Sequence, residues 1–326
     1  MAPLYPYSGF NFWSNVENNW TFLDSARSAI FLIASNFSDH IFLLPSYTCP
    51  TVWDALNKAG VEYHFIDIDD NLDFDISELN KSLDIYSDRK IVLIPTSLFG
   101  VRIRNYKELY PSLIILEDRA QHLINLSSIA DFQVISFGRG KFVSGFGGGG
   151  VLDKYSRLPS LQYGLYVKNN FFNCYFLSIF QKVISRVWFI IEGTRLDPES
   201  SNILKLKTIK PYLMSKVKKR WILNTISSLD ESHRVMISNF YLDNIKKEYL
   251  FNIERDVSYL RFPIKKSVNF TGVSKIREFY ETLRLSSKKG GSNVNNAQKL
   301  TSASFLPTHN LVTMKYARRL VEKINE

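Results

Sequence analysis

Cysteine is scarce in this chain of 326 residues, which contains only Cys49 and Cys174. Two cysteines so far apart exclude a disulfide framework and a thiolate zinc site, and they favour a reducing compartment. We therefore expect no metal centre. The N-terminus also lacks a basic stretch followed by an apolar run, so we expect no secretory signal and a cytoplasmic protein.

Nucleotide-binding and nucleic-acid-binding motifs are missing as well. The glycine run at 145–150 lacks the Gly-Lys-Ser/Thr ending of a P-loop and the setting of a dinucleotide fingerprint, so we interpret it as a backbone-packing turn. The net charge of +10 arises in the second half, where 161–326 hold 28 basic and 13 acidic residues. Such charge can attract nucleic acid, an acidic membrane or a diphosphate. Without a nucleic-acid motif we expect no nucleic-acid partner, and we interpret the basic cluster at 216–220 as a solvated helix face.

The first half does contain a regular alternation of apolar runs and helix signals. Helices are predicted at 25–33 and 48–58, the second with Gly60 as its stop signal. Short strands are predicted at 41–44, 63–66, 91–94, 113–116 and 134–137. This alternation predicts an α/β fold with a mostly parallel central sheet covered on both faces, in which ligands bind beyond the carboxyl ends of strands.

The second half has a different pattern. Apolar residues spaced by three or four predict helix throughout 208–250. Short strand-like runs and further helices are predicted at 259–264, 304–306, 271–284 and 311–325. We therefore expect a large domain over 1–207 and a smaller α+β C-terminal domain over 208–326.

Two side chains follow the ends of predicted strands. Asp118 comes shortly after the strand at 113–116, and Lys141 follows the strand at 134–137. A lysine amine and an acid at a strand's carboxyl end are the two groups that a pyridoxal 5'-phosphate (PLP) enzyme needs. The amine forms a Schiff base, and the carboxylate pairs with the protonated ring nitrogen, whose charge lowers the pKa of the acid. Asp118 and Lys141 are therefore the predicted catalytic pair.

The surroundings of this pair resemble the DegT/DnrJ/EryC1/StrS family of PLP-dependent sugar aminotransferases. Residues 117–121 read Glu-Asp-Arg-Ala-Gln, like the family's Glu-Asp-x-Ala-Gln motif, and Lys141 follows a Ser-Phe pair at 136–137 as the family's lysine does. Further segments that resemble family motifs are 25–29, 45–49, 59–69, 95–100 and 306–309. The resemblance covers roughly 1–155 and 208–326. It implies a fold-type I PLP enzyme, related to aspartate aminotransferase in fold, that forms a homodimer.

The resemblance also implies how individual residues hold PLP. Gln121 would contact the 3'-oxygen of the ring, and Ser136 would bind the phosphate together with backbone N–H groups at 26–27. A helix N-terminus offers unpaired donors for such a dianion. Tyr47 would supply an aromatic surface, and Cys49 stands where an aromatic residue often stacks on the ring. The predicted cofactor-binding residues are Ala26, Arg27, Tyr47, Cys49, Asp118, Gln121, Ser136 and Lys141.

Several positions depart from the family pattern. Arg27 replaces the usual threonine beside the phosphate, where its guanidinium is expected to neutralise the anion more strongly than a hydroxyl, and Gly148 replaces an acid. Pro211 and Leu213 replace an asparagine, which in the family reaches the phosphate in the partner subunit, and an arginine. Either a neighbour such as Lys210 substitutes for the asparagine, or the active site is altered.

Residues 161–193 form an unusual aromatic-rich insertion. The part at 171–191 is strongly apolar but contains Lys182 and Arg186, and two cations near the middle argue against a membrane span. Three alternatives stay open: buried core or dimer interface, a helix on a membrane surface, and a groove for a lipid-linked acceptor. The second alternative would make the cytoplasmic protein peripherally membrane-associated.

The resemblance predicts an aminotransferase that moves an amino group from an amino acid such as glutamate to a nucleotide-linked keto-sugar, in polysaccharide or glycoside biosynthesis. The family's dehydratase branch has histidine at the lysine position, so Lys141 disfavours that reaction. An alternative from another class is a catalytically silent PLP-binding or scaffold homologue in a membrane-associated polysaccharide assembly. The substitutions at Arg27, Pro211 and Leu213 keep this alternative open.

Overall fold

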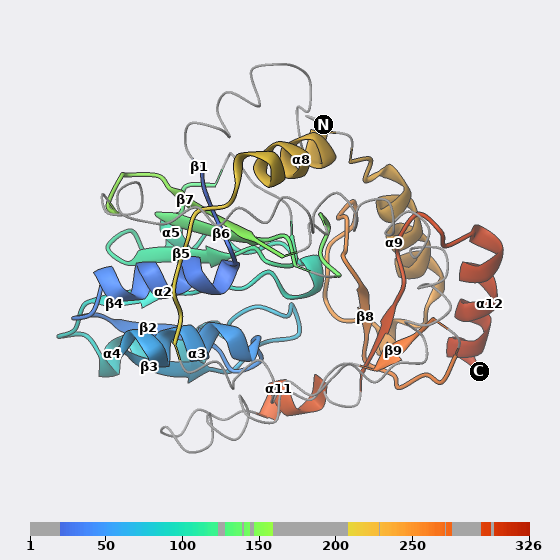
Figure 1. Cartoon of the computed structure of the whole chain (residues 1–326). Helices are drawn as coiled ribbons and strands as arrows, with labels where there is room; N and C mark the ends of the chain where they lie inside the picture. Colours follow the sequence, from blue (N-terminus) through green and yellow to red (C-terminus); the bar gives the residue numbers. More distant parts are fainter. Residues whose placement is uncertain are drawn as a thin grey trace.

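The computed structural model describes residues 20–122, 128–138, 140–143, 147–158, 208–227, 229–270, 272–275, 295–300 and 303–326. The predicted insertion at 161–193 lies outside the described residues, as do Cys174, most of the predicted helix at 271–284 and residues 145–146 of the glycine run. Within the described ranges the chain forms two sheets flanked by helices (Figure 1).

The larger sheet contains seven of the described strands and is mostly parallel, as predicted. Its strands are β1 (Trp20–Leu23), β2 (Ile41–Pro45), β3 (Glu62–Ile66), β4 (Ile91–Leu93), β5 (Ile114–Asp118), β6 (Phe132–Ser136) and β7 (Gly149–Asp153). Their order is β1-β7-β6-β5-β4-β2-β3. The pairs from β3 to β6 are parallel, whereas β7 runs antiparallel to both β6 and β1. The carboxyl ends of β2 to β6 therefore share one edge, where an α/β sheet binds ligands.

The first two helices of the described residues begin where local capping chemistry allows it. α2 (Ala26–Asn36) begins after Ser25, whose hydroxyl accepts a hydrogen bond from the Ser28 N–H at 3.1 Å. α3 (Pro50–Ala59) begins with proline at its first position and ends at Gly60, which has a φ of 74°. Both helices predicted in this part of the chain are confirmed, with small shifts at their ends.

Alternate residues of the central strands pack into separate cores on the two faces of the larger sheet. On β2, Phe42 and Leu44 pack with α2 and α3, whereas the intervening residues pack with α4 (Ile76–Ile85) and α5 (Tyr106–Leu109). A strand covered on both faces is apolar at successive positions, which explains the continuous apolar runs in the sequence.

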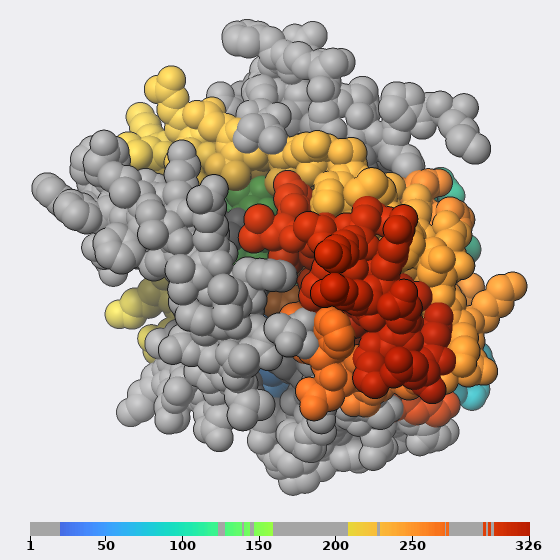
Figure 2. Space-filling model, turned by 90° about the vertical axis from the view of Figure 1, so that its right-hand side faces the viewer, coloured from blue at the N-terminus to red at the C-terminus, as the bar shows by residue number. Residues whose placement is uncertain are grey.

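The smaller sheet is antiparallel, with the order β8-β10-β9. Its strands are β8 (Phe262–Ile264), β9 (Ser274–Lys275) and β10 (Ser304–Leu306). α9 (Ser232–Asn244) and α12 (Met314–Asn325) share one buried core with this sheet. α12, red in Figure 2, covers part of the face turned toward the viewer. The short elements elsewhere in the described chain are α11 (Asn295–Lys299) and two 3-10 turns, η1 (Leu98–Gly100) and η3 (Lys247–Tyr249).

The prediction of helix throughout 208–250 is wrong for its first residues and for 245–250, where only the 3-10 turn η3 follows α9. The segment 208–215 is extended and lies beside β1, where Leu213 forms an antiparallel bridge with Leu23. Helix begins only at α8 (Lys216–Ser227) and, after a break, at α9. The apolar side of α8 packs on the larger sheet. Pairing with a strand distant in sequence has therefore overridden the helical spacing of the apolar residues.

The carboxyl edge of the larger sheet faces the smaller sheet. Phe99, in the turn after β4, has its ring centroid 4.4 Å from that of Phe305 in β10, and its carbonyl accepts a hydrogen bond from the Leu260 N–H at 3.0 Å. Gly100 has a φ of 95°, and a Cβ on it would lie 2.8 Å from the Leu260 nitrogen. Because only glycine allows this approach, the turn fixes the junction between the two sheets.

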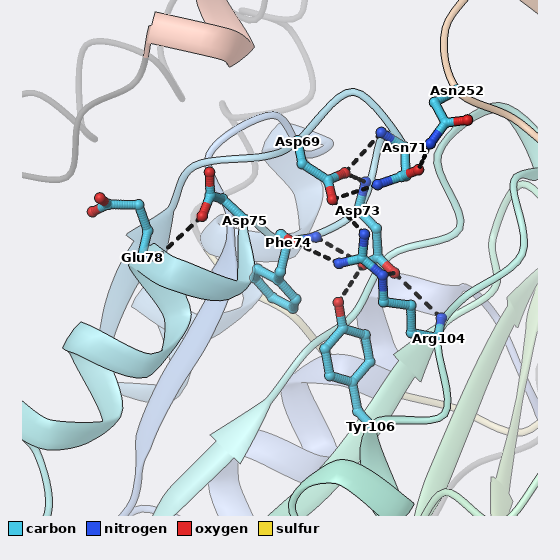
Figure 3. A network of polar contacts seen from close by, with 9 residues as sticks. All are labelled: Asp69, Asn71, Asp73, Phe74, Asp75, Glu78, Arg104, Tyr106 and Asn252. Carbon is cyan, nitrogen blue, oxygen red and sulfur yellow. Dashed lines mark hydrogen bonds and ion pairs between the residues drawn. The ribbon is translucent and has the colours of Figure 1, made fainter.

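A polar network in the β3–α4 connection supports the same junction (Figure 3). Asp73 is buried and accepts hydrogen bonds from the Tyr106 hydroxyl at 2.8 Å and from the Arg104 N–H at 3.2 Å. Burial raises the pKa of Asp73, and these two bonds oppose that rise. Asn252, which follows α9, donates to the Asn71 side chain at 2.5 Å. The connection is thereby anchored both to the start of α5 (Tyr106–Leu109) and to the C-terminal part of the chain.

Candidate active site

Asp118 is the last residue of β5 and is 4% exposed. Its N–H donates to the Pro95 oxygen at 2.9 Å, and its own carbonyl accepts from the Ser97 N–H at 2.9 Å. Its carboxylate accepts from the Ala120 N–H at 2.9 Å. Burial raises the pKa of Asp118, while the Ala120 bond and the charge of Lys141 lower it. The sequence predicts a lowered pKa for Asp118 when the protonated ring nitrogen of PLP pairs with it. In the protein without the cofactor, burial has the larger effect, and the pKa of Asp118 is raised.

Lys141 follows β6 in a turn in which its N–H donates to the Gly138 oxygen at 3.3 Å. The residue is half-buried, and its positive charge lowers the pKa of Asp118. The two residues therefore lie near each other, because β5 and β6 are neighbouring parallel strands that end at the same edge.

The N-terminus of α2 lies beside the ends of β6 and β7. Ser25 forms a bridge with Gly148, and Gly149 pairs with Ser136. A Cβ on Gly149 would overlap the backbone nitrogen of Ala26. Glycine at this position lets the first turn of α2, which contains no acidic residue, approach the end of β6. Ala26 and Ser136 thus share one corner of the edge, where a helix N-terminus favours an anion.

The guanidinium of Arg27 forms an ion pair with Asp54 of α3. Lys58 pairs with the same carboxylate at 2.7 Å. The guanidinium of Arg27 is therefore already engaged by a carboxylate that it shares with Lys58, and its contact with a phosphate stays a prediction. The backbone N–H of Arg27 stays a predicted phosphate donor.

The other predicted cofactor residues lie after β2 and β5. The Tyr47 ring is buried, and its centroid is 6.0 Å from that of Phe99. Cys49 precedes the first turn of α3, with its thiol 3.1 Å from the Thr51 hydroxyl. Gln121 is half-buried just beyond the end of β5. All three occupy the carboxyl edge, and their contacts with a cofactor stay predictions.

The basic cluster at 216–220 lies on α8 and is only in part the solvated face that the sequence predicts. Lys218 is half-buried, and its Cε would lie 3.6 Å from a Cβ on Gly148. The Nζ of Lys219 lies 5.3 Å from the Phe22 ring centroid. A lysine of α8 therefore reaches the glycine turn beside the N-terminus of α2, which the sequence could not reveal because the two segments are distant along the chain.

Thr96 is a residue of this edge that the sequence reasoning misses. It follows β4, forms a bridge with Asp118 and is 6% exposed. Its hydroxyl has no hydrogen-bond partner within the described part of the chain. A buried polar group without a partner is costly, so the hydroxyl fits a bound polar ligand. Its place in the family-like segment 95–100 is the signal that could have identified it.

Two arginines reach the same edge from the C-terminal part of the chain, and the sequence reasoning misses both. The Nη2 of Arg261, next to β8, would lie 3.7 Å from a Cβ on Gly140. The guanidinium of Arg234 on α9 lies 5.1 Å from the Phe142 ring centroid. The arginines therefore contact the residues that precede and follow the predicted catalytic lysine in the chain. Burial and the nearby cationic groups lower the pKa of His309 to about 4, so this residue adds no charge at neutral pH.

Within the described ranges, no group of three or more His, Cys, Asp or Glu side chains could hold a metal ion. No helix in the same ranges is long and apolar enough to cross a membrane.

This edge fits PLP in several respects. It combines a lysine amine, a buried carboxylate, an anion-favouring corner and a hydroxyl that has no hydrogen-bond partner among the described residues. The glycine at position 149 lets the N-terminus of α2 come close to that corner, since any side chain there would collide with the helix backbone. The residues present therefore fit the ring nitrogen, the aldehyde and the phosphate of the cofactor.

No protein-family model matches the sequence, and no curated protein matches it. Solved structures match nearly the whole chain. A DegT/DnrJ/EryC1/StrS aminotransferase from Brucella abortus is 16% identical, with a TM-score of 0.65 over 98% of this chain and 90% of its own. Helicobacter pylori PseC, an aminotransferase of pseudoaminic acid biosynthesis, is 13% identical, with a TM-score of 0.65 over 94% and 85%. The PLP-bound E. coli GDP-4-keto-6-deoxy-D-mannose-3-dehydratase is 15% identical, with a TM-score of 0.68 over 96% and 90%.

These matches confirm the predicted fold class, the α/β fold of PLP-dependent aminotransferases. At such low identity the similarity establishes the fold alone. Since the same fold carries aminotransferases and a dehydratase, the reaction has to be argued from the side chains at the carboxyl edge.

Proposed function

We propose that this protein is a PLP-dependent aminotransferase that moves an amino group from an amino acid, with glutamate as the expected donor, to a nucleotide-linked keto-sugar. The observation that carries the proposal is the proximity of Lys141 to the buried carboxylate of Asp118 at the carboxyl edge of the larger sheet. The sugar substrate class is supported by neighbours of the same fold, one of which acts in pseudoaminic acid biosynthesis. A homodimer, with a large domain over 1–207 and a small one over 208–326, belongs to the same proposal.

The two central residues have complementary tasks. PLP, when bound, supplies an electron sink for the carbon that carries the donor's amino group. Asp118 holds its negative charge against the ring nitrogen, and burial keeps that attraction strong. Lys141 would hold the cofactor, and its free amine would take the proton from the donor's α-carbon.

The remaining residues bind and orient the cofactor. Ser136 and the backbone N–H groups of Ala26 and Arg27 bind the phosphate at the N-terminus of α2. The approach of Lys218 to the neighbouring glycine turn adds positive charge there. Gln121 would bind the 3'-oxygen of the ring, while Tyr47 and Cys49 would lie in the ring's surroundings. This set offers contacts to each end of the cofactor.

Lys141 favours amino transfer over the dehydration that the E. coli neighbour performs. A primary amine can hold the cofactor covalently and then exchange a proton at the α-carbon. The histidine of the family's dehydratases cannot form that covalent bond. The lysine therefore supports the aminotransferase reaction.

The absorbance spectrum of the purified protein with added PLP tests the proposal. We expect a band of bound cofactor that is lost in Lys141→Ala, kept in the control Lys154→Ala, and bleached when glutamate is added. Lys154 is a matched control because it also follows a strand of the larger sheet but is exposed. A folded protein without a lysine-dependent band would refute the aminotransferase and favour the silent homologue. The sugar acceptor is then sought by adding nucleotide keto-sugars to the glutamate-treated protein and following recovery of the band.

A further inference from the structure

The guanidinium of Arg261 has no anionic partner in the described part of the chain. Its described contacts are with the Phe305 ring, whose centroid is 5.8 Å from Cζ, and with the turn at Gly140. Arg261 is half-buried, so part of its hydration is lost. A guanidinium removed from water is costly unless an anion pairs with it. This arginine therefore offers several unused donors beside the predicted catalytic lysine.

The position of Arg261 is set by the backbone of the junction. Its N–H donates to the carbonyl of Phe99 at 3.4 Å, and the Leu260 N–H donates to the same carbonyl at 3.0 Å. Phe99 has a φ of 60°, a left-handed conformation that a bulky residue rarely adopts. The turn after β4 thus holds Arg261 against the carboxyl edge of the larger sheet.

Arg234 adds a second positive charge with a fixed orientation. Its Nη1 donates to the Thr308 hydroxyl at 3.0 Å and to the Leu260 oxygen at 3.3 Å. Burial lowers the pKa of Arg234 to about 10, while the charge of Glu231 raises it. Burial in turn raises the pKa of Glu231 to about 7, so this carboxyl balances the guanidinium only in part near neutral pH. Among the described residues, the charge of the two arginines is therefore only partly balanced by a neighbouring carboxylate.

We propose that Arg261, supported by the charge of Arg234, binds the α-carboxylate of the amino-acid donor. The inference rests on the proposed aminotransferase function and names the donor-binding residue for it. The α-carboxylate stands on the carbon that also bears the reacting amine, so it has to lie close to Lys141. In the sugar substrate, the sugar ring separates the diphosphate from the reacting carbon. A cation that binds the diphosphate therefore has to lie farther from Lys141. The planar fork of arginine also matches a carboxylate in a bidentate pair.

Glutarate, a dicarboxylate without an amine, tests the anion site without needing the cofactor. Isothermal titration calorimetry should show glutarate binding to the wild type and to the control Arg255→Gln, and about 10- to 100-fold weaker binding to Arg261→Gln. Arg255 is a suitable control because it is an exposed arginine paired with Asp243. In Arg261→Lys, which keeps the charge and loses the fork, the binding should be intermediate. Circular dichroism of all variants establishes that they are folded.

Kinetics of the glutamate half-reaction give the second readout. In Arg261→Gln the glutamate concentration at half-maximal rate should rise by about 10- to 100-fold, while PLP affinity stays at the wild-type value. Unchanged glutarate binding and unchanged half-saturation in folded Arg261→Gln would overturn the inference. The inference would also be overturned if Arg261→Gln weakened the binding of uridine diphosphate but not the binding of glutarate, because the site would then bind the nucleotide.

The two proposals fail in distinguishable ways. A lysine-dependent cofactor band together with Arg261-independent glutarate binding removes only the donor-site inference. If glutarate binding depends on Arg261 but no cofactor band appears, the aminotransferase proposal is refuted. The bound carboxylate would then not belong to an amino-group donor.

Discussion

Replacement of Asp118 by asparagine would isolate the charge of the buried carboxylate from its shape. The side chain is 4% exposed, and asparagine has nearly the same volume. Its amide oxygen can still accept the Ala120 N–H, which lies 2.9 Å from the carboxylate. The substitution therefore preserves packing and this hydrogen bond, and it removes the negative charge.

We expect Asp118→Asn to weaken PLP binding severely. Removal of one member of a buried ion pair costs about 3–5 kcal/mol. Since each 1.4 kcal/mol or so is a factor of ten, the dissociation constant should rise roughly a hundredfold to a few thousandfold. The loss should appear in equilibrium titrations of the protein with PLP, followed by absorbance or by quenching of tryptophan fluorescence.

The same substitution should have the opposite effect on the stability of the protein without PLP. Burial raises the pKa of Asp118, so the folded protein favours the protonated carboxyl. Wild-type stability should therefore fall as pH rises from the ordinary aspartate value of about 3.9 through the raised folded value. Asparagine carries no charge at any of these pH values. Above the folded pKa the variant should consequently be at least as stable as the wild type, and the difference should shrink on acidification.

Urea denaturation at pH 5 and pH 8, without PLP, measures this second effect. Glu62→Gln is the matched control, because it makes a similar change on an exposed residue at the start of β3. Wild-type PLP affinity in Asp118→Asn would refute the pairing of this carboxylate with the cofactor ring. A variant that is less stable than the wild type at pH 8 and equally stable at pH 5 would show that the charge supports the fold, contrary to the reasoning above.

Three further substitutions test the fold around the site. Gly100→Ala should lower the free energy of unfolding by about 1–3 kcal/mol in urea titrations, because its Cβ would lie 2.8 Å from a backbone nitrogen; Gly60→Ala, with open space around it, should cost less. Tyr106→Phe should cost about 1–3 kcal/mol, because buried Asp73 loses a hydrogen bond of 2.8 Å. That loss should increase with pH, since the missing bond favours the ionised carboxylate. Burial raises the pKa of Glu231 to about 7, so wild-type melting temperatures should fall between pH 5 and pH 8, and Glu231→Gln should remove most of this fall.

The central strands and the meeting of Asp118 with Lys141 could be predicted from the sequence, because both depend on local patterns. Strands covered on two faces are apolar at successive positions, as in β2. Residues that follow neighbouring parallel strands must lie at one edge. The prediction that Asp118 and Lys141 meet also required β5 and β6 to be neighbours in the sheet. Consecutive strands in an alternating α/β chain are usually adjacent, so this condition was expected to hold.

The missed features depend on contacts between distant segments. The strand-like course of 208–215 requires β1 as its partner, and the helical spacing of its apolar residues gives no sign of that pairing. The first residues of β7 are glycines with low strand propensity, so the local pattern did not predict this strand, although the family resemblance implies a strand after the glycine turn; it forms because β6 and β1 pair with it on both sides. The ion pair between Arg27 and Asp54 likewise follows from the packing of α2 on α3.

The two halves of the proposed site are built on different parts of the fold, and this arrangement makes the proposals separable. Asp118, Lys141 and the N-terminus of α2 belong to the larger sheet, whereas Arg261 approaches from beside the smaller one. Cofactor affinity should therefore respond to Asp118→Asn and donor affinity to Arg261→Gln. The turn at Phe99 joins the two parts through hydrogen bonds to the 260–261 backbone, so distortion of that turn should weaken donor binding before cofactor binding. If distortion of the turn weakened PLP binding first, the turn would have to shape the cofactor edge directly, and the division of tasks between the two sheets would be wrong.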